Sequence, residues 1–202
     1  MKRNLAYLAA EFYRIAEQLQ RERAEAAPIV KIVSQKPWAY AHDPIPERWT
    51  TAGLVLELTA AADGQPEAAD PRHRLALALL ATRIAAALDD RTPEIIRAQA
   101  TAHAWRALAE AHSSKGDHPE ALLALDHAHH TLRDHPALTF DRATLQLTHA
   151  HILHHLGRGH DALAQLAEAR TVLHDHGAHI EVAQCDRLLR LIESGRASGR
   201  EE

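Results

Sequence analysis

Apolar residues recur every three or four positions through most of the chain, which is the spacing of one face of an α-helix. Residues 2–26 open with this pattern, and their narrow apolar stripe consists of Leu5, Leu8, Phe12, Ile15 and Leu19. This stripe predicts an amphipathic N-terminal helix over residues 1–26 that packs either on the rest of the chain or on a second copy. No segment alternates apolar and polar residues as a β-strand does, so we expect an all-α fold.

Residues 27–47 interrupt the helical pattern. Four prolines lie in this stretch, at positions 28, 37, 44 and 46. Proline removes a backbone donor and disfavours helix in the residue before it. The stretch also contains three large apolar residues, Trp38, Tyr40 and Ile45. We therefore expect a proline-rich but ordered linker that contains one short turn of helix.

The helical pattern returns at residue 48 and continues to residue 194. Helices are expected at 48–62, 71–88, 93–114, 118–133, 137–156, 159–175 and 178–194. Thr50 or Thr51 is a suitable cap for the first of them, and Asp70-Pro71 is a strong start for the second. Glycines mark several helix ends, among them Gly116 and Gly157. Residues 195–202 are polar and are expected to form a flexible tail.

Two of these helix pairs share a common frame of small and bulky residues. The first pair carries this frame at Trp105, Leu108, Ala109, Gly116, Ala121, Leu125 and Ala128, and the second carries part of it at Gly157, Ala162, Leu166 and Ala169. This frame resembles the tetratricopeptide repeat (TPR), in its divergent bacterial form. The turn glycines are 41 residues apart, whereas the family period is about 34, so the helices are expected to be longer than usual. The earlier pair, 48–62 with 71–88, resembles a degenerate copy.

The resemblance implies a short right-handed solenoid of antiparallel helix pairs over residues 48–194, preceded by the extra N-terminal helix. A plain helical bundle, which the same alternation of small and bulky residues also suits, is the alternative fold. In this family the first helix of each pair lines a concave groove that binds a peptide or a helix. Carried over by frame, the groove residues are His103, Arg106, Glu110, Ser113, Thr144, Leu147, His151, His154 and His155. The expected function is therefore a protein–protein interaction module, a scaffold or regulatory adaptor. An ordinary solvated surface is the alternative interpretation of the same residues.

Composition narrows the possible partners. The formal net charge is −4 and the isoelectric point about 6.5, so the chain lacks the basic balance typical of nucleic-acid-binding proteins. It has a single cysteine, Cys185, and no apolar stretch long enough to cross a membrane. We expect a cytoplasmic protein whose partner is another protein or peptide rather than nucleic acid or membrane. No nucleophile arrangement or phosphate-binding loop is visible, so neither enzymatic activity nor a cofactor is expected.

Histidine is unusually abundant, with 17 residues in the chain. His151 and His155 are four residues apart, a spacing that places two imidazoles on one helix face and suits two ligands of one metal ion. Further ligands cannot be identified from spacing, so these two are only weak candidates and no metal site is predicted. A histidine-rich metal-binding protein remains an alternative function. A structural subunit that forms a homo-oligomer through residues 1–26 is another.

Overall fold

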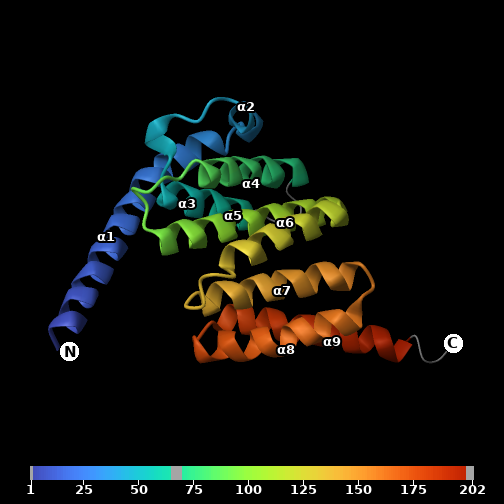
Figure 1. The fold of residues 1–202 in the computed structure, drawn as a ribbon. Helices are drawn as coiled ribbons and strands as arrows, with labels where there is room; N and C mark the ends of the chain where they lie inside the picture. Colours follow the sequence, from blue (N-terminus) through green and yellow to red (C-terminus); the bar gives the residue numbers. More distant parts are fainter. Residues whose placement is uncertain (1, 65–69, 199–202) are drawn as a thin grey trace.

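The computed structural model describes residues 2–64 and 70–198, and every regular element within these ranges is helical, which confirms the all-α fold (Figure 1). The elements are α1 (Lys2–Val33), α2 (Pro37–Ala41), the 3₁₀-helix η1 (Glu47–Trp49), α3 (Ala52–Asp63), α4 (Pro71–Ala86), α5 (Glu94–Lys115), α6 (His118–Leu132), α7 (Thr139–His155), α8 (Gly159–Asp175) and α9 (His179–Ser198).

The helix ends follow local chemistry that is visible in the sequence. The Thr51 hydroxyl accepts a hydrogen bond from the Leu54 amide at 3.2 Å, and Asp70 accepts one from the Arg72 amide at 2.9 Å. Each side chain therefore satisfies a free amide in the first turn of its helix. Gly116 ends α5 in the left-handed region, with φ of +81°, a conformation that glycine adopts without steric cost. Only Gly116 and Asp117 lie between α5 and α6, so this connection is very short.

The N-terminal helix is longer than the sequence predicts. α1 continues through Pro28 to Val33, where a linker was expected from residue 27. Pro28 and Ala24 are both exposed, so water can reach the Ala24 carbonyl that loses its intrahelical partner at the proline. Ala26 and Val33 are buried in the core on either side of the proline. Tertiary packing thus keeps the helix continuous across the proline.

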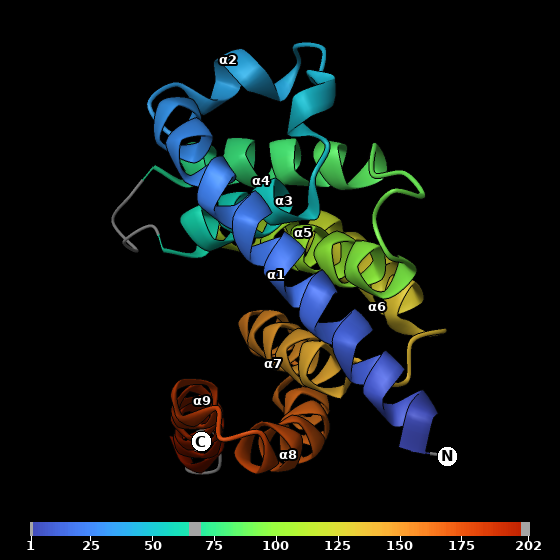
Figure 2. The ribbon, with the colours of Figure 1, turned by 90° about the vertical axis from the view of Figure 1, so that its left-hand side faces the viewer.

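The two halves of α1 have different surroundings. The carboxyl-terminal half packs against α3, and Leu19 contacts the core there. The amino-terminal half extends away from the helix stack (Figures 1 and 2), with Phe12 and Tyr13 exposed. The side chains of Leu5 and Leu8 lie outside the described part of the chain. Docking on the rest of the chain therefore accounts for the second half of the helix, and self-association through residues 1–26 stays a prediction.

The remaining linker is ordered and contains two short helical segments where one turn was expected. α2 packs against α4, and η1 precedes α3. The guanidinium group of Arg83 on α4 donates to the backbone carbonyls of Tyr40, Ala41 and Asp43. These hydrogen bonds satisfy carbonyl groups that have no partner within a regular helix, because the segment is too short and too rich in proline to form a long helix.

The main stack consists of α3 to α9. α3, α5, α7 and α9 pack on one another in sequence order, and each consecutive pair of helices from α3 to α9 is also in contact. The core is correspondingly divided into three successive clusters along the stack. α5 contributes Ala104 to one cluster and Leu108 to the next, and α7 contributes Leu145 and Leu153 to the second and third. Both helices thus bury apolar residues against neighbours on either side.

The residues of the repeat frame lie at helix contacts and turns. Ala109, Ala121 and Ala128 are fully buried where α5 and α6 pack together. Trp105 is half-buried and stacks on the His127 ring, with the centroids 4.3 Å apart. The second set shows the same burial at Ala162, Leu166 and Ala169, and Gly157 adopts a φ of +73° in the turn before α8. Small side chains at these positions let the helix backbones approach closely.

The carboxyl end differs from the expected tail. α9 continues to Ser198, and residues 199–202 lie outside the described residues. Its apolar side buries Cys185, Leu188 and Ile192 against α7 and α8. Burial raises the pKa of the Cys185 thiol to about 11, which keeps it protonated near neutral pH. Across the described residues, no helix combines the length and apolar character needed to cross a bilayer.

Candidate functional site

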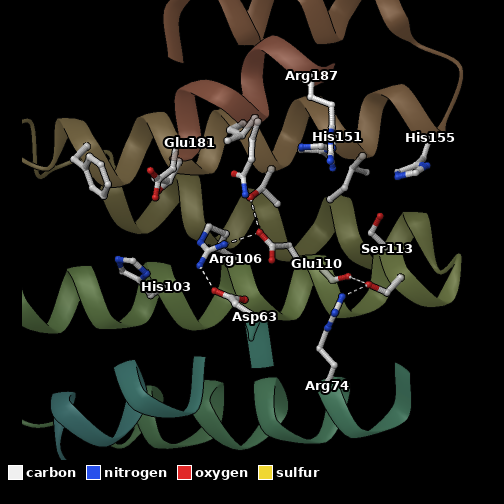
Figure 3. Close-up of a pocket in the computed structure, with 17 residues that line it drawn as sticks. Asp63, Arg74, His103, Arg106, Glu110, Ser113, His151, His155, Glu181 and Arg187 are labelled. Atoms are coloured by element: carbon white, nitrogen blue, oxygen red, sulfur yellow. Dashed lines mark hydrogen bonds and ion pairs between the residues drawn. The ribbon is translucent and has the colours of Figure 1, made fainter. Parts of the chain in front are cut away.

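A cavity of about 580 Å³ opens on the side of the stack formed by α5, α7 and α9. Asp63 at the end of α3 and Arg74 at the start of α4 complete its wall (Figure 3). Eight of the nine predicted groove residues line it, namely His103, Arg106, Glu110, Ser113, Thr144, Leu147, His151 and His155. We refer to this cavity as the groove. It brings together side chains from five helices that lie far apart in the sequence.

His154 is the predicted groove residue that does not line the groove. It is rotated by about 60° from His151 around the axis of α7, because three residues turn an α-helix by about 300°. Its ring instead faces the His155 ring, with centroids 6.0 Å apart. His154 therefore lies at the margin of the helix face that the groove uses.

The floor of the groove is an ion network centred on Arg106. The guanidinium group donates to Glu110 at 2.5 Å and to Asp63 at 2.7 Å. Thr148 donates its hydroxyl proton to the same oxygen of Glu110 at 2.8 Å. Arg106 is 17% exposed, and Asp63 and Glu110 are 33% and 31% exposed. The network therefore joins α3, α5 and α7 at a place that water reaches only in part.

The environment shifts the two carboxyl groups of this network in opposite directions. Burial and the nearby Glu110 raise the pKa of Asp63, against the attraction of Arg106. Burial would also raise the pKa of Glu110, but Arg106 and the Thr148 hydroxyl outweigh it, so the pKa of Glu110 is lowered. Both carboxylates raise the pKa of Arg106 above its usual value, although burial alone would lower it. Arg106 is thus a permanent cation that holds two acids in place.

His103 belongs to a second buried cluster beside the groove. Its Nε2 lies 2.9 Å from Oδ1 of Asp141, and the same oxygen accepts a hydrogen bond from the Gln99 amide at 3.1 Å. Burial would raise the pKa of Asp141, but these two hydrogen bonds outweigh it and lower the pKa. Asp141 is only 6% exposed. His103 is therefore held by a partner from α7 instead of projecting freely into the groove.

Cationic and histidine side chains gather at one end of the groove. His151 and His155 follow each other on successive turns of α7, and Arg187 projects beside His151 from α9 (Figure 3). Burial lowers the pKa of His151, and the nearby His155, His154 and Arg187 lower it further against the opposing charge of Glu110. Glu181 lies toward the opposite end. The groove is therefore polarised along its length.

Several lining residues come from helices for which the repeat frame is weak. Asp63 and Arg74 lie in the degenerate first pair, and Glu181, Gln184 and Arg187 lie in the last helix, which carries neither of the two repeat frames. The spacing of three residues between those on α9 places them on one helix face. Extending the frame one helix further would have found them, because α9 follows α7 in the row just as α7 follows α5.

The histidines do not form a metal centre of three or more ligands in the part of the chain that the structure describes. His151 and His155 lie on one face of α7 as their spacing predicts, but no third histidine, cysteine, aspartate or glutamate joins them within the described ranges. Zinc sites in proteins use at least three such ligands. The metal-binding alternative therefore gains no support from the arrangement of the described side chains.

Two histidine pairs instead bridge α6 and α7. His118 stacks on His155 with ring centroids 6.3 Å apart, and His129 lies 5.7 Å from His149. Nδ1 of His149 is buried and has no hydrogen-bond partner among the described residues. Burial lowers the pKa of both His129 and His149. Asp126 opposes the decrease at each histidine, and Arg158 lowers the pKa of His149 further. The interface therefore favours neutral imidazoles.

Acid should weaken this interface, and His149→Leu should reduce the effect. A histidine whose folded-state pKa is lowered binds fewer protons when folded, so stability is lost as pH falls below the unfolded pKa of about 6.5. Leucine also removes the buried unpartnered nitrogen, and we expect a gain of about 1 kcal/mol in the free energy of unfolding. Urea unfolding at pH 7 and pH 5 measures both effects. The exposed His160→Leu is the control, and an unchanged pH dependence in His149→Leu would contradict the prediction.

Comparison with known proteins identifies no relative. No protein-family model matches the sequence, and neither a curated protein nor a solved structure shows a significant match to the chain. Function is therefore inferred from the geometry of the groove and from the residues that line it.

Proposed function

We propose that the chain is a protein-interaction module of the tetratricopeptide type that binds a peptide or a helix in the groove. The observation that carries this proposal is the groove itself. It is lined by one face each of α5, α7 and α9, and eight residues placed there by the repeat frame contribute to it. Its volume of about 580 Å³ falls in the range of about 300–1,000 Å³ found for small-molecule and cofactor pockets, so it can hold part of a peptide.

The packing of the stack supports the same proposal. α3, α5, α7 and α9 follow one another in a row, and the core is distributed in successive clusters between neighbouring helices. A repeat solenoid is stabilised by contacts between neighbours in this way and presents an extended surface on the inner helices. We infer a short right-handed solenoid, a scaffold or adaptor without catalytic activity of its own.

A bulky side chain introduced into the groove tests the proposal. Peptides would first be selected on the intact protein from a displayed random library, and their affinities measured by fluorescence anisotropy. Gln184 is exposed and lines the groove, so Gln184→Trp should obstruct it without disturbing the core. We expect the selected peptides to lose about tenfold or more in affinity, which corresponds to about 1.4 kcal/mol.

The matched control is Ala183→Trp, which adds the same side chain at the neighbouring exposed position outside the groove lining. This variant should retain the affinity of the intact protein. If both variants bind every selected peptide as tightly as the intact protein, the groove is not the binding surface and the proposal fails.

A further inference from the structure

The cationic end of the groove has donors that no acidic group of the groove neutralises through a described contact. Asp63 and Glu110 are both engaged with Arg106 on the floor. Glu181 lies six residues before Arg187 on α9, which separates their backbones by about 9 Å along the helix. Arg187 is exposed, and no described hydrogen bond or ion pair occupies His151. This end of the groove therefore carries an excess of positive charge.

The donors come from three helices and face the same space. His151 and His155 project from α7, Arg187 from α9, and the Ser113 hydroxyl from α5 (Figure 3). Across the groove, Arg74 donates to the Ser114 hydroxyl at 2.7 Å and is not counted among these donors. Guanidinium, imidazole and hydroxyl donors in such a group form charge-assisted hydrogen bonds with the oxygens of an anion.

We propose that the end of the groove formed by His151, His155 and Arg187 binds a phosphoryl group carried by the peptide ligand. This inference rests on the peptide-binding function proposed above and specifies the chemistry of the ligand. A phosphoryl group offers a charge near −2 and three acceptor oxygens, which suits donors that approach from several helices. A carboxylate has two acceptor oxygens in one plane and a single charge, so it would use fewer of these donors.

Phosphate binding should change the titration of the histidines. The groups that face His151 are Glu110 from α5, His154 and His155 from α7, and Arg187 from α9. His155 additionally faces His118 from α6. Without an anion, burial and the neighbouring histidine and arginine side chains lower the pKa of His151 against the opposing charge of Glu110, and burial with His154 and His118 lowers the pKa of His155. A bound dianion stabilises the charged imidazolium, so their pKa values should rise on binding.

Nuclear magnetic resonance of the imidazole groups measures this directly. Inorganic phosphate would be added to the full chain, with sodium chloride at matched ionic strength as the blank. We expect saturable shifts of the His151 and His155 signals and an upward movement of their titration midpoints. Arg187→Gln should weaken phosphate binding by about tenfold or more, the effect expected for one charge-assisted hydrogen bond. Arg187 is exposed, so the variant should fold normally.

Arg190→Gln is the matched control, since Arg190 is exposed on the same helix and does not line the groove. It should bind phosphate like the intact protein. Shifts that do not saturate, or that saturate equally in Arg187→Gln, would overturn the inference. Acetate that binds as tightly as phosphate would also overturn it, because the site would then be a carboxylate site.

The experiments distinguish failure of the phosphoryl site from failure of the proposed peptide-binding function. If selected peptides bind in the groove but neither a phosphoserine nor Arg187→Gln alters their affinity, peptide binding stands and the phosphoryl site fails. If phosphate binds at His151 and Arg187 while Gln184→Trp has no effect on any peptide, the phosphoryl site stands as an ion site. The peptide-binding function then fails.

Discussion

Replacing Arg106 with methionine should lower the free energy of unfolding by about 3 kcal/mol at pH 7, because it leaves Asp63 and Glu110 without their shared cation. Both acids accept hydrogen bonds from Arg106 in the folded protein. Removing one partner of a buried ion network typically costs about 3–5 kcal/mol. About a third of each carboxyl side chain remains exposed, so water screens part of the loss and the lower value is expected. Urea unfolding followed by circular dichroism measures it.

The pH dependence identifies the cause of this loss. Without Arg106, burial and mutual repulsion should hold the pKa values of Asp63 and Glu110 above those of the unfolded chain. A carboxyl group with a raised folded-state pKa binds more protons when folded, so the variant regains stability as pH falls through that range. The difference in free energy of unfolding between the variant and the intact protein at the same pH should therefore be smaller at pH 5 than at pH 7.

A second substitution provides the control. Arg106→Met combined with Glu110→Gln removes one of the two uncompensated charges and should recover about 1 kcal/mol or more at pH 7. A deficit that is below about 1 kcal/mol, or that does not change with pH, would show that the network behaves as a solvent-screened surface contact.

The helices and their turns could be predicted from the sequence because their signals are local. Asp70-Pro71 starts α4, and Gly116 and Gly157 lie in the left-handed turns that follow α5 and α7. The main failure was Pro28, where the local rule against proline was outweighed by the burial of Ala26 and Val33. A helix that packs along another element retains its conformation at a position where an isolated peptide would break.

The groove could be predicted only as far as the repeat frame extends. His103, Arg106 and His151 were placed because they lie in helices where small and bulky residues mark the frame. The partners that give these side chains their electrostatic character were not predicted. Asp63 lies 43 residues before Arg106, and Asp141 lies 38 residues after His103. Such pairs depend on which helix faces share an interface, and no sequence spacing encodes that.

α1 and α3 pack tightly at Gly53, where a substitution should have the second large effect. A Cβ atom at this position would overlap Cβ of Glu22 and would lie 2.5 Å from the Glu22 carbonyl carbon and 2.6 Å from the Arg23 amide nitrogen. Two of these three atoms are backbone, so they cannot move unless α1 moves. The Gly53 amide also donates to the Glu22 carboxylate at 3.1 Å. Glycine is therefore required where the two helices cross.

Gly53→Ala should destabilise the protein by about 2–3 kcal/mol through overpacking, even though alanine favours a helix by about 1 kcal/mol over glycine. The overlap should displace α1 and expose Ala26 and Leu19, which now pack in the core beside α3. Hydrogen exchange should therefore speed up in α1 before it does in α7 or α8. Gly195→Ala is the matched control, because a Cβ built there has no described atom within 4 Å apart from the adjoining residues and backbone of its own helix, and alanine should leave stability unchanged or raise it slightly. If Gly53→Ala were as stable as Gly195→Ala and its α1 amides stayed protected, α1 would not be held by close packing on α3.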